Sequence, residues 1–428
     1  MAGLGAKLWT VGEIATAANI NGYLMDQTVM KFASTTTRDA AFGGAGEPTL
    51  SEGMFAYTSD TDTLWLYDGS NWVNVLGSNI GQQALSNRNV VINGAMQVAQ
   101  RGTSTAGVTD ANNFGVDRFQ SNIATLGTWT VSQESDAPTG SGFRKSLKYL
   151  VTTADASPAA ADFCAVIHKI EGQNVQQFLK GTASAKQFSL IMWVKSGTTG
   201  TYIAELIDND NARYCSQSYT ISVADTWEKK TLVFPADTTG VLDNDNALSL
   251  AFNFYLAAGS TRNSGTLQTV WGTSTTAGRA TGQVNLAAAA VALTNYWQVT
   301  GVQLEVGSVA TPFEFEQIST TLNKCQRYYQ KLQNWTGLAD TTTDIAGNMQ
   351  FLCEMRAAPT TSKVAGSTVY WRTPVADNSS SGWTFGAASS TPTSLWFQIS
   401  SVSGLTAGQA THNRNGANAP IVEVSAEL

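Results

Sequence analysis

The sequence QLEVGSVATPFE, residues 303–314, joins two different patterns. It follows the alternating run YWQVTGV at residues 296–302 and precedes FEQISTTLNKCQRYYQKL at residues 315–332. Pro312 cannot continue a strand ladder because it lacks an N–H group. The stretch therefore predicts the end of a strand, a turn at Thr311–Pro312 and the start of a helix. A joint of this kind predicts a boundary between two domains.

Downstream of the turn, the sequence predicts a helix and then a second β domain. Apolar residues recur at intervals of four, three and four, which marks one face of a linking helix over residues 319–332. Alternation then returns, so we predict a smaller C-terminal β-sandwich over residues 333–428. The residues that carry the two patterns are Ile318, Leu322, Cys325 and Tyr329, followed by Met349, Phe351, Cys353, Met355, Leu395, Phe397 and Ile399.

Upstream of the turn, residues 81–318 are typical of a jelly-roll β-sandwich. In LSLAFNFYLAAG, every second residue from Leu248 to Leu256 is large and apolar, as in a strand with one buried face. Similar runs, separated by turn sequences, predict eleven strands and no regular helix between them. The predicted strands are 90–98, 114–120, 128–133, 146–152, 163–170, 187–195, 201–207, 213–223, 227–234, 248–257 and 296–306.

The N-terminal part predicts a small anchor. Thr10 and Glu13 fit a capping box at the start of a helical segment over residues 10–31, so residues 1–34 are predicted as a helical anchor. Three short strands over residues 52–76 predict a β-meander adaptor at residues 35–80. Its five aromatic residues exceed what three strands can cover, which favours docking to a partner unless they pack on their own helix. These residues are Phe55, Tyr57, Trp65, Tyr67 and Trp72.

Composition excludes several classes of partner. Charged residues form only 13% of the chain, about half of the roughly 25% usual in soluble domains, and the net charge is −7. No Lys/Arg cluster is present, so we predict no nucleic-acid partner. No run of 18 apolar residues is present, so we predict no membrane insertion.

The sequence offers little chemistry. It has no nucleophile elbow, P-loop or dinucleotide fingerprint, and its four cysteines and two histidines lack the spacing of a zinc site. Asp208/Asp210 and Asp243/Asp245 lack the Gly and Glu of a calcium loop and are predicted to form turns. His168 is predicted to be structural. We therefore predict no metal and no cofactor.

Two carboxylate pairs, Glu134/Asp136 and Glu314/Glu316, could in principle hydrolyse a glycoside. Nothing in the sequence places either pair at the roughly 5–10 Å separation that this reaction requires. We predict no catalytic residue and no enzymatic activity.

Three blocks of the chain together resemble virion proteins of tailed bacteriophages, of the tail-fibre and receptor-binding kind. The first block runs from IATAANINGYLMDQTVMKF to DTLWLYDGSNWV, and the second from NRNVVINGAMQVAQRGTS to GVQLEVGSVATPFE. The third begins with LNKCQRYYQKL, continues through MRAAPT and ends with SAEL. They are similar to a particle-proximal adaptor, a carbohydrate-binding-module-like jelly roll and a distal knob.

This resemblance implies a homotrimer on the virion that docks to other virion proteins through residues 1–80 and binds a host surface glycan. Residues 10–31 and 318–331 are expected near the three-fold axis, unless they only cover the neighbouring sandwich. In such modules a carboxylate at the position of Glu305, on the strand face of Trp297, can help to hold calcium. Alternatives are a head-decorating or baseplate protein without receptor binding, and a tail-spike polysaccharide depolymerase. The absence of long β-helix repeats argues against the depolymerase.

We expect the glycan to meet exposed tryptophans, because an indole face stacks on sugar C–H groups while amides and hydroxyls bond the sugar hydroxyls. Trp396 shares a polar strand face with Gln398 and Ser400, where a subunit interface is the alternative to a ligand. Trp371 alternates with Val369 and could instead belong to the core. The candidate ligand-binding residues are Tyr370, Trp371, Trp383 and Trp396, with Trp271 and the loop at 272–282 as a competing site in the jelly roll.

Overall fold

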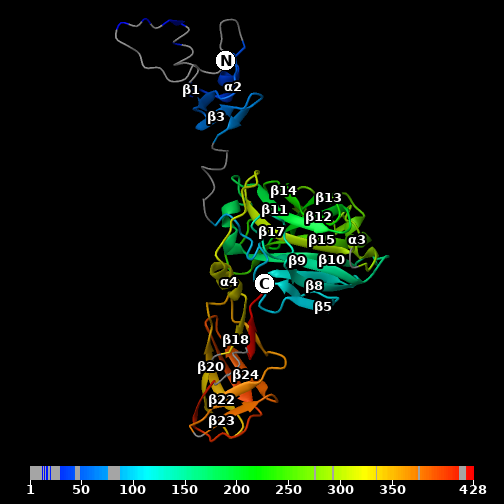
Figure 1. Ribbon diagram of the computed structural model, residues 1–428, viewed down its shortest axis with the longest axis vertical. Helices are drawn as coiled ribbons and strands as arrows, with labels where there is room; N and C mark the ends of the chain where they lie inside the picture. The colour runs from blue at the N-terminus through cyan, green and yellow to red at the C-terminus, as the bar shows by residue number, and fades with distance from the viewer. Residues whose placement is uncertain are drawn as a thin grey trace. The chain divides into compact units, whose positions relative to one another are not determined.

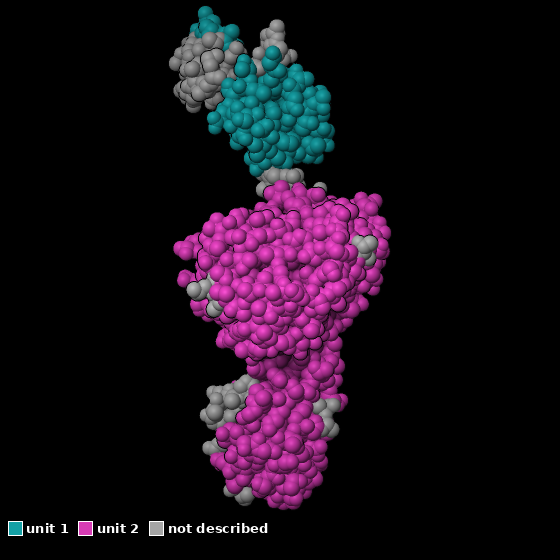
Figure 2. All heavy atoms as spheres, turned by 90° about the vertical axis from the view of Figure 1, so that its right-hand side faces the viewer, with its two compact units in different colours: residues 1–86 teal, residues 87–428 magenta. Residues whose placement is uncertain are grey.

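The computed structural model describes residues 29–43, 49–75, 87–273, 276–291, 294–333, 335–374, 376–413 and 421–428, with five single positions between 12 and 20. The chain divides into two compact units, residues 1–86 and 87–428, which are coloured separately in Figure 2. The predicted mainly-β fold class is confirmed. In these ranges, no helix is long and apolar enough to cross a membrane.

Within its described residues, the first unit contains a four-stranded sheet and the short helix α2 (Thr35–Asp39). β2 (Phe55–Thr58), β3 (Thr63–Tyr67) and β4 (Trp72–Asn74) form the expected meander. β1 (Val29–Phe32) adds a fourth strand parallel to β2, so the predicted helix is wrong at its C-terminal end. The rest of the predicted helical segment lies outside the described residues, apart from single positions.

Aromatic residues on one face of this sheet pack around a single arginine. The Arg38 guanidinium of α2 lies 4.7 Å from the Trp65 ring and 5.0 Å from the Trp72 ring, and Arg38 is only 5% exposed. Phe42 packs on Trp72 with ring centroids 5.8 Å apart. Two of the five meander aromatics therefore pack on the unit's own helix, which was the alternative to docking.

The jelly roll consists of a seven-stranded and a six-stranded antiparallel sheet. In order across the sheet, the first contains β16 (Gly272–Thr273), β13 (Arg213–Ile221), β12 (Gly200–Asp208), β15 (Leu248–Ala258), β10 (Phe163–Glu171), β7 (Phe119–Ala124) and β6 (Phe114–Val116). The second contains β14 (Glu228–Phe234), β11 (Phe188–Ser196), β17 (Tyr296–Val306), β9 (Ser146–Thr153), β8 (Thr128–Glu134) and β5 (Ser104–Val108). Short helical turns, η2 (Gly172–Asn174), η3 (Gln176–Phe178), α3 (Ser260–Asn263), η4 (Thr276–Gly278) and η5 (Leu286–Ala288), lie in the connections.

One predicted strand is wrong. Residues 90–98 form turns, because Asn93 and Met96 adopt left-handed backbone conformations with φ of 63° and 57°. The Asn93 side chain forms hydrogen bonds with the backbone of Val98 and Asp117, in place of the bonds that a neighbouring strand would supply. Nine of the eleven predicted strands are present, and the tenth, 114–120, is divided by a turn at Asp117–Arg118 into the paired strands β6 and β7. The pattern missed the short strands β5 and β16.

A bulge in β17 changes which of its side chains face the core. Gly301 has φ of 62°, and the register against β11 shifts beside it. Trp297 lies in the core before the bulge, whereas Leu304 lies in the core after it. The expectation that Glu305 shares a face with Trp297 is therefore wrong, since the extra residue of a bulge moves the following side chains to the opposite face.

His168 lies between the two sheets, packed among the aromatic rings of the core. It is fully buried, with its ring 5.2 Å from that of Phe252 and 4.8 Å from that of Phe119. Burial, and then the charge of Arg118, hold the pKa of His168 well below its usual value. The structural role predicted for this residue agrees with its place in the core.

The C-terminal domain packs a three-stranded sheet on a seven-stranded one (Figure 1). The three strands are β18 (Tyr329–Leu332), β27 (Val422–Ser425) and β21 (Thr360–Lys363). The seven, in order, are β23 (Asp377–Ser380), β22 (Val369–Arg372), β26 (Ala410–Asn413), β19 (Thr336–Ala339), β20 (Ile345–Gln350), β25 (Ser394–Ser400) and β24 (Thr384–Ser390). The predicted smaller β-sandwich is confirmed.

The linking helix is shorter than the 319–332 predicted. α4 spans Ile318–Gln326, and residues 329–332 form β18 instead. The helical spacing misleads here because Tyr329 and Leu332 are buried in a strand that pairs with β27.

The joint between α4 and the jelly roll is built on one buried carboxylate. Glu171 at the end of β10 accepts two hydrogen bonds from Arg327, at 2.8 and 2.9 Å, and one from the Tyr328 hydroxyl. Burial alone would raise the pKa of Glu171, but the bonds from Arg327 and Tyr328 outweigh it and hold the pKa below its usual value. Glu427 adds ion pairs to Arg101 and Arg118. Side chains of the two domains therefore neutralise each other across the joint.

We predict that His168→Leu stabilises the protein more as the pH falls. Because the folded state keeps the imidazole neutral, the unfolded state binds more protons below about pH 6.5, and the wild type loses up to about 1.4 kcal/mol per pH unit there. Urea unfolding at pH 7.5, 6.5 and 5.5 measures this difference. The exposed His412→Gln is the matched control, and a gap between His168→Leu and wild type that does not change with pH would contradict the prediction.

We predict that Arg327→Met destabilises the second unit by about 3–5 kcal/mol, because it leaves the buried Glu171 carboxylate without a cation. Lys324→Met in the same helix is the control. It removes only a partly exposed pair with Glu316, which is worth about 1 kcal/mol or less. Chemical unfolding followed by tryptophan fluorescence measures both, and equal losses in the two variants would refute the assignment.

Candidate functional site

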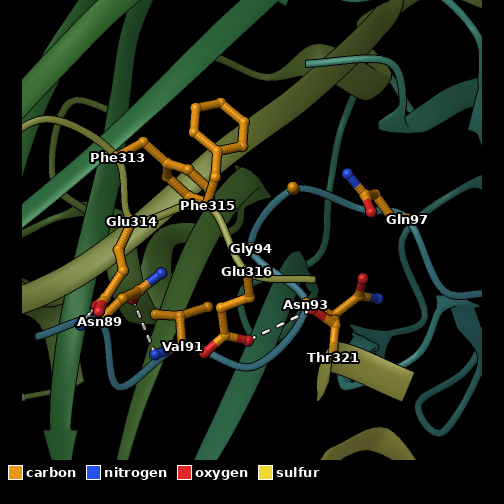
Figure 3. A pocket seen from close by; sticks show the side chains of 11 residues that line it. Asn89, Val91, Asn93, Gly94, Gln97, Phe313, Glu314, Phe315, Glu316 and Thr321 are labelled. Atoms are coloured by element: carbon orange, nitrogen blue, oxygen red, sulfur yellow. Dashed lines mark hydrogen bonds between the residues drawn. The ribbon is translucent and has the colours of Figure 1, made fainter. Parts of the chain in front are cut away.

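The segment from Phe313 to Glu316 and Thr321 of α4 line a small pocket together with residues that precede the first jelly-roll strand (Figure 3). Phe313 and Phe315 form its aromatic part, with ring centroids 4.9 Å apart, and both rings pack on Phe143. The lining residues are Asn89, Val91, Asn93, Gly94, Ala95, Gln97, Phe313, Glu314, Phe315, Glu316 and Thr321.

The carboxylates of this pocket are occupied by bonds within the chain. Glu314 accepts the backbone N–H groups of Asn87 and Asn89 at 2.6 and 3.0 Å. Glu316 pairs with Lys324 and accepts from the Thr321 hydroxyl at 3.4 Å. The pair Glu314/Glu316 therefore fastens the turn to the jelly roll, which leaves it poorly suited to acid–base chemistry.

Glu305 and Gln303 close the turn from the other side. Glu305 accepts from the backbone N–H and hydroxyl of Thr311 at 2.7 and 2.5 Å, and Gln303 accepts from the Glu314 N–H at 2.8 Å. Both Glu305 oxygens are thus used. The described residues also contain no group of three His, Cys, Asp or Glu placed to hold a metal.

The other acidic candidates also have local partners. Asp136 pairs with Lys195 and accepts from Trp227; burial alone would raise the pKa of Asp136, but these bonds lower it. Glu134 accepts from Ser132 at 2.6 Å. Asp208 and Asp245 accept backbone N–H groups of nearby residues, and Asp208 also pairs with the buried Lys180. Asp210 instead accepts the backbone N–H of Asp243 and so links the two acidic segments.

Three of the five candidate tryptophan and tyrosine residues lie in cores. Trp371 and Trp383 are each 1% exposed in the C-terminal core, so the structure places them in the interior instead of on a binding surface. Trp271 is 8% exposed in the jelly-roll core, where its indole N–H donates to Pro235. Alternation alone could not separate these residues from Trp396, because a Trp suits either face of a strand.

The loop that accompanies Trp271 is attached to the outer side of the seven-stranded jelly-roll sheet. Arg279 binds the fully buried Glu205 through two bonds of 2.6 and 2.7 Å. Asn253 and the Tyr255 hydroxyl donate to the same carboxylate at 3.1 and 3.0 Å. These bonds saturate Glu205, so this cluster holds the loop in place and offers no free carboxylate to a ligand.

Trp396 lies on the outer face of the seven-stranded sheet of the C-terminal domain and is 45% exposed. Its directly paired neighbours continue as a row across all seven strands, and every member is exposed. We call this set the Trp396 row. From β23 to β24 it contains Asp377, Arg372, His412, Thr336, Asn348, Trp396 and Ser389.

A second row beside it carries Ala410, Leu338, Ala346 and Gln398 on the same face. Leu338 is 55% exposed, so this face presents both apolar surface and polar groups. Tyr370 also belongs to the outer face, on β22, but three strands separate it from Trp396. The structure thus brings one predicted residue, Trp396, together with polar residues that sequence patterns did not connect to it.

Comparison with known proteins finds no matching family model and no matching curated protein. Solved structures do match, at low similarity. The enzymatically active domain of tailspike protein 4 of bacteriophage CBA120 has 15% identity and a TM-score of 0.27 over 51% of this chain, which covers only 21% of that chain. The family 22 carbohydrate-binding module of Clostridium thermocellum Xyn10B has 9% identity and a TM-score of 0.27, over 53% of this chain and 100% of that module.

A putative sugar binding protein from Bacteroides thetaiotaomicron has 12% identity and a TM-score of 0.26, over 51% of this chain and 99% of that protein. At these TM-scores the likenesses carry no weight for ligand or activity. The functional argument therefore rests on the residues of this chain.

We predict that Trp371→Ala and Trp396→Ala differ sharply in their effect on stability. Trp371→Ala leaves a cavity in the C-terminal core and costs about 3–5 kcal/mol. Trp396→Ala removes a half-exposed side chain from the sheet surface and costs less than about 1 kcal/mol. Equilibrium unfolding in urea measures both, and a large loss for Trp396→Ala would show that this residue is structural.

Proposed function

We propose that this chain is a structural component of a tailed-bacteriophage particle, most simply a trimeric tail fibre. It docks to other virion proteins through residues 1–80 and binds a host surface glycan through its C-terminal β domain. The observation that carries the proposal is the Trp396 row: a solvent-exposed indole set in a line of polar side chains on an open sheet face. An exposed aromatic of this kind suits a ligand or a partner better than it suits water.

The docking part is supported by the sheet face of the first unit that lies opposite Arg38. One directly paired residue from each strand forms an apolar row across it. The row consists of Val29, Phe55, Leu66 and Val73, of which Val29, Phe55 and Val73 are 55%, 37% and 45% exposed. Such a row on a small sheet favours a partner surface that removes it from water.

The trimeric state is supported by apolar side chains that remain exposed around the joint. Val309, Phe315 and Ile318 are each more than half exposed, although Cys325 of the same helix is buried. α4 therefore covers the sandwich with one side only, and its first turn remains open to a neighbouring subunit.

We propose binding without cleavage. The acid of a glycoside hydrolase needs a raised pKa. The bonds to Asp136 lower its pKa instead, and Glu314 is held by backbone N–H groups. A depolymerase of tail-spike type, or a head-decorating or baseplate protein that binds no receptor, are the competing functions.

We predict that Trp396→Ala lowers binding of the labelled full-length protein to host cells at least about tenfold, while Leu352→Ala leaves binding unchanged. Leu352 is a matched control because it is 65% exposed, apolar and in the same domain. Light scattering on both samples should give three times the 45.4 kDa subunit mass. Unchanged adsorption of Trp396→Ala would refute the site, a monomer would refute the trimer, and reducing ends released from host polysaccharide would favour the depolymerase.

A further inference from the structure

We infer that the Trp396 row binds a neutral, unbranched oligosaccharide that crosses strands β25, β20 and β19. One sugar ring stacks on Trp396, and the hydroxyls of the following sugars bond to Asn348 and Thr336. This inference rests on the proposed function and adds the class and direction of the glycan.

The polar groups along this part of the row are free to bind a ligand. Trp396, Thr336 and Ser389 make no side-chain hydrogen bond within the described part of the chain. Asn348 uses only its oxygen, which accepts from Gln350 at 2.9 Å. The amide N–H groups, the indole N–H and two hydroxyls therefore point to a ligand rich in donors and acceptors, as a sugar is.

The direction of the ligand follows from which neighbours of Trp396 are already occupied. Along β25, the Ser394 hydroxyl bonds to Thr391 at 3.1 Å and Ser400 bonds to Asp344. Across the strands, Asn348 and Thr336 are available at successive spacings of about 4.8 Å. Along β25, only Gln398 remains unused in the described chain, because Ser394 and Ser400 are already bonded. Across the strands, both Asn348 and Thr336 follow Trp396, so a ligand that crosses the strands finds more unused partners.

The neutral class follows from the charges on this face. From Thr336 to Ser389 the row carries no ionised side chain, and neither does the second row. Further along, Arg372 lies 3.8 Å from Asp377, so its charge is balanced by a direct neighbour. An acidic sugar would lose hydration of its charged group on this surface and would find no unpaired cation there to compensate for that loss. Leu338 adds apolar area for the C–H face of a second sugar.

The test uses full-length protein on an array of neutral and acidic microbial glycans, followed by titration calorimetry with the best-bound soluble oligosaccharide. We expect binding to neutral glycans only, with affinity unchanged between 50 and 500 mM NaCl. Trp396→Ala should weaken it about tenfold or more, and Asn348→Ala several-fold, while Arg372→Ala should have no effect.

Each outcome has a distinct meaning. Selective binding of acidic glycans, lost with salt or in Arg372→Ala but still dependent on Trp396, would overturn the neutral class and leave the proposed function standing. Full binding by Trp396→Ala would overturn the site itself. If no glycan is bound, both the inference and the proposed glycan receptor fail.

Discussion

The arrangement of the second unit depends on the bulge at Gly301. If β17 alternated without interruption, Gln303 and Glu305 would lie on the same side as Trp297 and place a carboxylate in the core. The extra residue turns them to the far face, where they bind Thr311 and Glu314. Glu314 in turn holds the backbone of Asn87 and Asn89. One glycine in the left-handed region thus fixes both the start of the jelly roll and the turn that leads to α4.

From that turn the chain reaches the buried carboxylate of Glu171, which anchors the beginning of the C-terminal domain through Arg327 and Tyr328. The candidate site lies on the outer face of the same domain. Because the joint is made of several charged and hydrogen-bonded contacts, the Trp396 row belongs to the same compact unit as the jelly roll. Glu134, Asp136, Glu314 and Glu316 are engaged in internal bonds of the same kind.

Much of the fold could be predicted from local patterns, because a strand buried on one face alternates visibly. Nine of the eleven predicted jelly-roll strands and the smaller β-sandwich are present, and a tenth, 114–120, is divided into β6 and β7. Residues 90–98 misled because an Asn side chain supplies the bonds that a ladder would supply. Residues 329–332 were wrongly predicted as helix because their apolar spacing fits a helix and a strand equally well.

The candidate site was harder to predict, since it depends on which distant strands become neighbours. Trp396 could be singled out from its own strand. Its connection to Thr336 and His412 requires the pairing of β19 with β20 and with β26, which is a property of the assembled sheet. Trp371 and Trp383 have similar local sequences but face inward, so a tryptophan beside polar loops does not by itself mark a surface.

The position of β27 has a consequence for the order in which the protein can fold during synthesis. β27 is the central strand of the sheet β18–β27–β21, yet it is translated after both of its neighbours. The jelly roll has all of its strands once Val306 has left the ribosome and can form its core early. In the C-terminal domain, β18 and β21 each keep an unpaired edge until residues 422–425 leave the ribosome. Those edges can pair wrongly with another nascent chain. A chain released before β27 is made would therefore have a folded jelly roll and a C-terminal part that is prone to aggregate.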